Sequence, residues 1–329
     1  MLETSQSSTR SDHPAHREES RVPRTDDTPA RNFHPPAGRP RRSVARAIVP
    51  TVAVLCLSLI GSPAAAEEVE ETAFEQYVAL GDSFTAGPFV TEEANVQMPL
   101  LGCLQSSANY PKFLAEELGV GELIDVSCSG AVMSHFYEAQ FDDQPPQLEA
   151  LTEDTDLVTV GIAGNDFGFA DLLIDCAKRS ITNPIGSPCA DHYGDELDER
   201  IEGLRDEVST VYADIAERSP NATVLSVGYL QILPESGGCW PGVPISRGDV
   251  PFLDEAQIAL NEMLREESSA QGAVFVDVFE RGHDACQPAD TRWVEGVIPD
   301  NEAAPVHPNS AGMEATAAFV RDELGVPAP

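Results

Sequence analysis

Short apolar segments alternate with amphipathic segments along most of this chain, and that alternation restricts the fold more than any other feature. The apolar segments are typical of strands buried on both faces of a sheet. The amphipathic segments place apolar residues three and four positions apart, the period of a helix with one buried side. We expect strands at 77–80, 123–126, 157–160, 222–227 and 273–278, and helices at 109–118, 171–179, 195–218, 253–269 and 310–324.

Strands that alternate with helices predict a parallel sheet covered by helices on both faces. No Gly-, Ser- or Pro-rich linker after residue 67 is long enough to divide the chain. We therefore expect residues 67–329 to form a single three-layer α/β/α domain.

The first 66 residues differ in composition from the rest. Residues 1–43 are rich in Arg, Pro, Ser and Thr, which predicts disorder. The apolar run 44–60 follows Arg41-Arg42 and leads to three alanines at 64–66. This order is typical of a secretory signal peptide cleaved after Ala66. The alternative is a membrane anchor, but the run contains Pro50 and is shorter than the ~20 residues that span a bilayer. We expect a secreted protein with no stable membrane anchor.

Acidic residues outnumber basic residues by 55 to 20, and the formal net charge is −35. A nucleic-acid-binding protein needs a basic surface, so that class is excluded. Copies of so acidic a chain repel one another unless salt screens them, which favours a monomer. The acidity fits a protein that works in salty surroundings, and it fits an ordinary acidic secreted protein equally well.

Six cysteines remain once Cys56 leaves with the signal peptide, and an even number in an exported chain predicts disulfides. None lies in a Cys-x-x-Cys pair, so a zinc ribbon has no support. Other metal-ligand spacings such as His-Glu-x-x-His are also absent, and we expect neither a metal nor a cofactor. Fifteen connectivities are possible for six cysteines.

Four short motifs stand beside the expected strand and helix ends. Gly81-Asp82-Ser83 follows the first strand, where open α/β sheets bind their ligands. Gly130 follows the second strand and Asn165 the third, and a backbone N–H or an amide side chain can donate to an oxyanion. His307 precedes the last helix and suits a general base. Each motif alone is more typical of a turn or a capping residue than of a catalytic site.

Two familiar serine hydrolase patterns do not fit. Trypsin-like proteases follow Gly-Asp-Ser with Gly-Gly and place the histidine before the serine, whereas Phe84 stands here and every histidine after residue 66 follows Ser83. The Gly-x-Ser-x-Gly elbow of α/β-hydrolases is also absent at Ser83.

Taken together and in this order, the four motifs resemble those of the SGNH hydrolases, the GDSL-type lipases and esterases. The likeness runs from about Tyr77 to Leu324. Residues 128–131, 282–284 and 292–295 resemble the secreted actinobacterial lipase branch of that family. The resemblance implies a flavodoxin-like parallel sheet in an SGNH hydrolase domain over residues 67–329, with disulfides Cys103–Cys128, Cys176–Cys189 and Cys239–Cys286.

The resemblance also implies a role for each motif. Ser83 would be the nucleophile and His307 its general base. The N–H of Ser83, the N–H of Gly130 and the side chain of Asn165 would form the oxyanion hole. The implied function is a secreted serine esterase or lipase that hydrolyses acyl esters, either lipids or small esters, through an acyl-enzyme.

One position departs from the family pattern. The family often has Asp three residues before its histidine, and Ala304 stands there in this chain. We expect the backbone carbonyl of Ala304 to orient His307 in a Ser–His dyad. Asp300 and Glu302 are alternatives that would complete a triad.

Two other functions remain open on the same scaffold. One is a carbohydrate O-acetyl esterase, which would differ only in its grooves. The other is a non-catalytic surface-binding protein, although Ser83, Gly130, Asn165 and His307 together favour an enzyme.

Overall fold

Five parallel strands form one sheet in the order β2-β1-β3-β4-β5. This order is that of flavodoxin-like sheets, and the predicted parallel α/β fold is confirmed. The structure, a computed structural model, describes residues 74–90, 102–142 and 144–327, so the predicted signal peptide lies outside the described residues. The strands are β1 (Gln76–Gly81), β2 (Glu122–Asp125), β3 (Leu157–Gly161), β4 (Thr223–Val227) and β5 (Val274–Val276).

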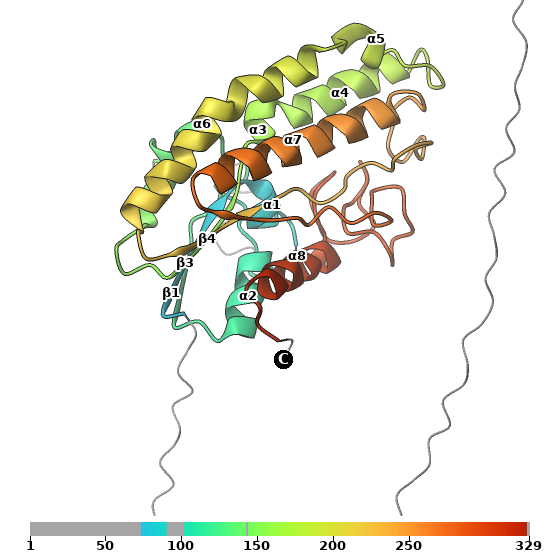
Figure 1. Cartoon of the computed structure of the whole chain (residues 1–329). Helices are drawn as coiled ribbons and strands as arrows, with labels where there is room; N and C mark the ends of the chain where they lie inside the picture. The colour runs from blue at the N-terminus through green and yellow to red at the C-terminus, as the bar shows by residue number, and fades with distance from the viewer. Residues whose placement is uncertain (1–73, 91–101, 143, 328–329) are drawn as a thin grey trace, which may run out of the picture. The chain divides into compact units, whose positions relative to one another are not determined.

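Helices cover both faces of the sheet. On one face α6 (Glu196–Arg218) packs against α7 (Val250–Ala270), and on the other α2 (Tyr110–Leu118) packs against α8 (Ser310–Glu323), as Figure 1 shows. The remaining helices are α1 (Ser83–Ala86), α3 (Gly164–Phe167), α4 (Phe169–Ser180) and α5 (Ala190–Tyr193), with 3-10 turns η1 (Met133–Phe136) and η2 (Gln147–Ala150).

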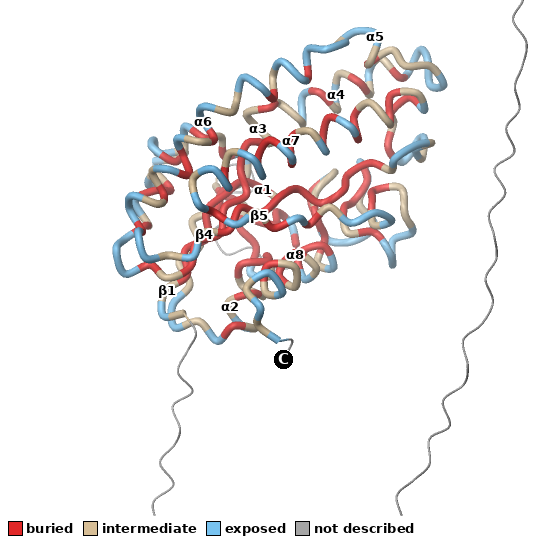
Figure 2. Tube along the Cα trace, in the orientation of Figure 1, coloured by how far each residue is buried: buried red, intermediate tan, exposed pale blue. Residues whose placement is uncertain are grey.

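The core lies between these layers. Residues 77–80 of β1 are fully buried, and every residue of β3 is buried, as expected of strands covered on both faces. Figure 2 shows the buried trace running through the strands and along the inner sides of the long helices. The buried residues of α6 are Leu197, Ile201, Val208, Val211, Tyr212 and Ile215, and partly buried Leu204 completes the predicted spacing of three and four positions.

Disulfides tie the loops at the carboxyl edge of the sheet. Cys103–Cys128 joins the segment before α2 to the loop after β2, and Cys176–Cys189 joins α4 to the N-terminus of α5. Cys239–Cys286 joins the β4–α7 loop to the loop after β5. The pairing is the one implied by the family resemblance. No helix in the described part of the chain is long and apolar enough to cross a bilayer.

Candidate active site

Ser83 is the first residue of α1, a one-turn helix that begins immediately after β1. The Asp82 side chain caps this helix by accepting a hydrogen bond from the Phe84 N–H at 2.9 Å. Gly87 ends the helix in the left-handed conformation. The Ser83 N–H lies in the first turn, where helical amides have no partner within the helix, and it can donate to another group.

The turn between β1 and α1 requires glycine at position 81. Gly81 has φ +148°, and a Cβ atom there would lie 2.6 Å from the Gly161 carbonyl oxygen and 2.4 Å from Thr85 Oγ1. This close approach lets the Asp82 N–H donate to Gly161 O at 2.9 Å. Ser83 is thereby fixed beside the end of β3.

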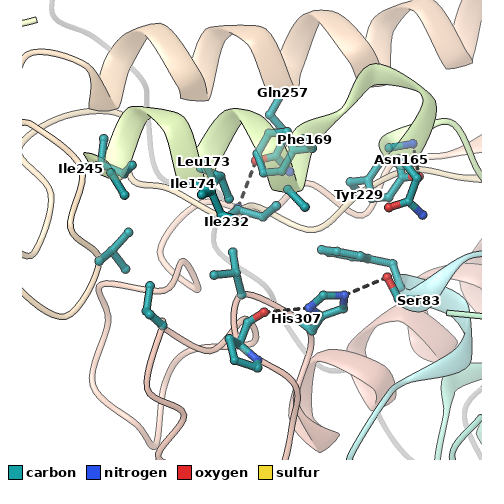
Figure 3. A pocket seen from close by; sticks show the side chains of 18 of the residues that line it. Ser83, Asn165, Phe169, Leu173, Ile174, Tyr229, Ile232, Ile245, Gln257 and His307 are labelled. Atoms are coloured by element: carbon teal, nitrogen blue, oxygen red, sulfur yellow. Dashed lines mark hydrogen bonds between the residues drawn. The ribbon is translucent and has the colours of Figure 1, made fainter. Parts of the chain in front are cut away.

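His307 and Ser83 lie side by side although they are far apart in the sequence. His307 Nε2 is 2.8 Å from Ser83 Oγ, and Nδ1 is 2.8 Å from the Pro305 carbonyl oxygen (Figure 3). A carbonyl only accepts, so Nδ1 carries the proton and Nε2 is left to accept from the Ser83 hydroxyl. Burial lowers the pKa of His307 below its ordinary value, an effect partly opposed by the Pro305 carbonyl. The ring is therefore neutral at pH 7 and can accept a proton.

The prediction that Ala304 orients the His307 ring is wrong. The Ala304 carbonyl accepts the backbone N–H of His307 at 3.2 Å, and the adjacent carbonyl of Pro305 faces the ring instead. Pro305 rather than Ala304 presents its carbonyl to the ring because Val306 has φ +60°. This conformation turns the chain sharply, and few β-branched residues adopt it.

Asp300 does not orient His307 either. Its carboxylate pairs with the guanidinium of Arg292, and its N–H donates to Glu295 Oε2 at 2.9 Å. Both partners belong to the segment 292–295, and neither contact involves the His307 ring. Glu302, the second alternative, is exposed on the same loop.

A buried carboxylate holds the loop that carries His307. Glu295 is fully buried and accepts hydrogen bonds from the side chains of Asn301 and Asn309 at 2.7 and 2.8 Å. Burial alone would raise its pKa, but these bonds, together with Arg292, keep the pKa below the ordinary value. The Glu295 N–H also donates to the His307 carbonyl at 2.9 Å. Glu295 thus fixes the backbone of His307 and not its ring.

Asn165 lies in the one-turn helix α3, directly after β3. Its Nδ2 donates one hydrogen to the Ala131 carbonyl at 2.8 Å and keeps a second hydrogen for another acceptor. Gly130, with φ +79°, immediately precedes Ala131, so the loop that carries Gly130 contacts Asn165. Asn165, Ser83 and His307 all line one cavity, whereas Gly130 is exposed beside it and does not line it.

Tyr229 joins the two turns, and the sequence analysis missed it. Its hydroxyl donates to Asp82 Oδ2 at 2.6 Å and accepts the Gly164 N–H at 2.7 Å. Its ring meets Phe84 edge-on, with centroids 5.1 Å apart. A side chain at position 164 would lie 2.8 Å from the Tyr229 oxygen, so glycine is needed there. The available signal was the position of Tyr229 just after β4, at the same edge of the sheet as the other motifs.

Asp82 and Asp166 support the turns. Burial raises the pKa of Asp82 to about 7, although hydrogen bonds from Tyr229 and the Phe84 N–H oppose the shift. Burial likewise raises the pKa of Asp166 to about 6, opposed by the Met133 N–H that it accepts. Neither carboxylate is bonded to His307 in the described structure.

The cavity beside Ser83 measures about 490 Å³. Its walls are almost entirely apolar, and Figure 3 shows α4 and the β4–α7 loop supplying side chains opposite His307. Lys178 and Gln257 are the polar residues farther along the wall. A cavity of this size and polarity suits an acyl chain with its ester at one end. The apolar wall residues of α4, its C-terminal extension and the β4–α7 loop include Phe169, Ala170, Leu173, Ile174, Ala177, Ile181, Ile232, Val243, Pro244 and Ile245.

No metal is indicated by this geometry. Within the described residues, no group of three or more His, Cys, Asp or Glu side chains could hold a metal ion. The polar groups that line the cavity near Ser83 include a hydroxyl, an imidazole and an amide, the groups used for acyl transfer, together with Asp82 and Tyr229.

Comparison with known proteins agrees with the fold and the motifs. Residues 79–315 match the GDSL-like lipase/acylhydrolase family. Lipase 2 of Streptomyces coelicolor is 37% identical over 294 residues, which cover 87% of this chain and 98% of that lipase. An esterase of Streptomyces scabiei is 28% identical over 315 residues, covering 82% of this chain and 91% of that esterase.

Solved structures show the same fold. The extracellular lipase of Streptomyces rimosus superposes with a TM-score of 0.60 and 25% identity, covering 75% of this chain and 98% of that one. Phospholipase A1 of Streptomyces albidoflavus superposes with a TM-score of 0.62 and 24% identity, covering 76% and 99%.

The chain therefore belongs to the GDSL-like lipase/acylhydrolase family and is a carboxylic ester hydrolase. Its similarity to several Streptomyces lipases agrees with the actinobacterial branch predicted from the sequence.

Proposed function

We propose that this protein is a secreted serine esterase or lipase in which Ser83 attacks the ester carbonyl and His307 acts as general base. The observation that carries the proposal is the 2.8 Å contact between His307 Nε2 and Ser83 Oγ at the end of an apolar cavity. A free serine hydroxyl is a poor nucleophile, and a neutral imidazole within hydrogen-bond reach removes its proton during attack.

The reaction proceeds in two halves. Ser83 Oγ bonds to the ester carbon while His307 Nε2 takes the hydroxyl proton, and the carbonyl oxygen becomes an oxyanion. When the tetrahedral intermediate collapses, the ester C–O bond breaks and His307 gives the proton to the leaving alcohol. Water then attacks the acyl-enzyme, losing a proton to His307, which returns it to Ser83 as the acid leaves.

Three donors would stabilise the oxyanion: the N–H of Ser83, the N–H of Gly130 and the free Nδ2 hydrogen of Asn165. The position of Ser83 in the first turn of α1 and the second hydrogen of Asn165 support the first and third donors. Fixed donors of this kind are worth roughly 3 kcal/mol each, or about a hundredfold in rate.

The Pro305 carbonyl replaces a triad carboxylate in this proposal. It selects the Nδ1–H form of the His307 ring, with Nε2 directed at Ser83. Because no carboxylate in the described part of the chain is hydrogen-bonded to the ring, the reaction runs with a Ser–His dyad. A neutral carbonyl stabilises the imidazolium less than a carboxylate would.

Export is supported by the leader at residues 1–66, by three disulfides and by the extracellular relative from Streptomyces rimosus. Disulfides of this kind form outside the reducing cytosol. We further propose that the exported protein is a monomer without a stable membrane anchor, because its net negative charge opposes association at low salt.

Hydrolysis of p-nitrophenyl esters from acetyl to palmitoyl tests the proposal, with Ser83→Ala beside the wild type. Activity that vanishes in the variant, with a maximum at medium or long chains, is expected from the length of the apolar wall. A maximum at acetyl would favour the carbohydrate O-acetyl esterase. No hydrolysis by a folded wild-type protein, together with no fluorophosphonate labelling, would favour the non-catalytic binding protein.

A further inference from the structure

Exposed apolar side chains gather around the cavity mouth. In the described part of the chain ten large apolar side chains are exposed, and six of them stand on the helix and loops bordering this cavity, so they are not scattered singly. We name these six the mouth rim: Ile174, Ile181, Ile185, Trp240, Val297 and Ile298.

Three loops of the rim are joined into one surface. Pro184 and Gly186, on either side of Ile185, accept N–H bonds from Arg247 and Gly248 at 3.0 and 3.1 Å. The Val297 N–H donates to the Gly242 carbonyl at 3.3 Å, which brings the third loop against the second. Three rim residues, Ile174, Ile181 and Val297, also line the cavity, so its apolar wall continues onto the outer surface.

Five of the six rim residues also lie on segments without acidic residues, whereas Ile174 directly precedes Asp175. The protein has 55 acidic residues, yet segments 176–190, 236–248 and 296–299 contain none. The same segments contribute three basic residues, Lys178, Arg179 and Arg247. Lys178 lines the cavity, Arg247 is exposed, and Arg179 is paired with Asp175.

We infer that the mouth rim docks on a zwitterionic phospholipid surface, so that the ester enters the cavity directly from aggregated lipid. This inference rests on the proposed ester hydrolysis and adds the physical state of its substrate. Burial of exposed isoleucine and tryptophan among acyl chains supplies the attraction. Lys178 and Arg247 can meet lipid phosphates, and segments 176–190, 236–248 and 296–299 themselves carry no carboxylate.

The charge of the whole chain selects a zwitterionic rather than an anionic surface. With a net charge of −35, the protein is repelled by anionic lipid over distances up to the Debye length of about 8 Å at physiological salt. A zwitterionic surface imposes no such repulsion while still presenting phosphate groups to the rim.

The test uses two rim residues that do not line the cavity, Ile185 and Ile298, which are 79% and 83% exposed. In a Ser83→Ala background, which prevents hydrolysis, the unmodified rim should cosediment with phosphatidylcholine vesicles. The double change Ile185→Glu, Ile298→Glu should weaken the partition coefficient at least tenfold. A matched control, Ile258→Glu with Val274→Glu, alters two side chains that are each 41% exposed on α7 and β5, and should change it less than twofold.

A second readout separates this inference from the proposed function. With Ser83 intact, Ile185→Glu, Ile298→Glu should hydrolyse a dissolved short-chain ester within twofold of the wild type and a vesicle-bound ester at least tenfold more slowly. Equal vesicle binding by both double variants, or binding only to vesicles that contain anionic lipid, would overturn the inference. If no ester is hydrolysed at all, the proposed function fails, while cosedimentation still decides whether the rim binds lipid.

Discussion

Removal of one hydroxyl, in Tyr229→Phe, should disturb the site without touching Ser83 or His307. The hydroxyl bonds to Asp82, which caps the helix of Ser83, and to the N–H of Gly164, which precedes Asn165. Phenylalanine keeps the ring and its edge-on contact with Phe84. The change therefore isolates the link between the two turns.

The structure sets the size of the effect. The hydrogen bond from Tyr229 to the Asp82 carboxylate, at 2.6 Å, has a charged acceptor, and such bonds contribute about 1.5–3 kcal/mol to stability. The Gly164 N–H would lose its acceptor, and an unsatisfied buried N–H destabilises the fold by about 1–3 kcal/mol. The two losses overlap, so we expect about 3 kcal/mol in all. For a domain of ~260 residues this lowers the melting temperature by about 5 °C.

The assay compares thermal unfolding and ester hydrolysis of Tyr229→Phe with those of Tyr212→Phe. Tyr212 is an equally buried tyrosine whose hydroxyl lies 2.6 Å from Ser226 Oγ, between α6 and β4. Its loss should cost about 1 kcal/mol and leave kcat unchanged. Loss of the Tyr229 hydroxyl should lower kcat about tenfold with little change in KM, because a misplaced oxyanion donor weakens only the transition state.

The pH dependence provides a sharper test. Burial holds the pKa of Asp82 at about 7 in the folded protein, above its unfolded value, and the Tyr229 hydroxyl opposes that shift by stabilising the ionised carboxylate. The contribution of the Tyr229 hydroxyl to stability is therefore largest above pH 7, where Asp82 is ionised. The deficit in melting temperature that Tyr229→Phe causes should be larger at pH 8.5 than at pH 5.5. An equal deficit at both pH values, or unchanged kcat, would refute the reasoning.

Three further predictions concern the histidine, its loop and the charge. The acid limb of the kcat/KM profile should have its midpoint below pH 6.5, because burial lowers the pKa of His307, and a midpoint above 7 would contradict the assigned environment. Asp300→Ala and Glu302→Ala should each retain at least a third of the wild-type kcat, since Pro305 faces the ring, whereas a thousandfold loss in either would indicate a triad. Added salt should raise the melting temperature of this chain of net charge −35, and a midpoint independent of salt would remove the case for adaptation to salty surroundings.

Most of the fold could be predicted because its signals are local and repeated. The apolar runs of β1 and β3 and the helical spacing in α6 each report burial directly, and their predicted bounds lie within two residues of the structure. The one-turn helices α1 and α3 were missed, since four residues are too few to show a helical period. They are formed by tertiary contacts such as the bond from Asp82 to Gly161.

Only those parts of the site that depend on residue types and their order along the chain could be predicted from the sequence. Ser83, Asn165 and His307 each stand beside a strand or helix end, but their roles were predicted from the order of their motifs and its resemblance to a known family. The partner of the His307 ring could not be predicted. Whether the carbonyl of Ala304 or that of Pro305 faces the ring depends on one backbone angle, at Val306. Tyr229 carries no motif, and its role depends on two bonds to residues distant in the sequence.

The central claim, that His307 activates Ser83 as a nucleophile, is tested most directly by covalent labelling. A fluorophosphonate is added to folded wild-type protein, and peptide mass spectrometry then locates the adduct. The account predicts one adduct per chain, on the peptide that contains Ser83, and at least a hundredfold slower labelling in His307→Ala. Labelling of a different residue, or equal labelling rates with and without the His307 imidazole, would contradict it.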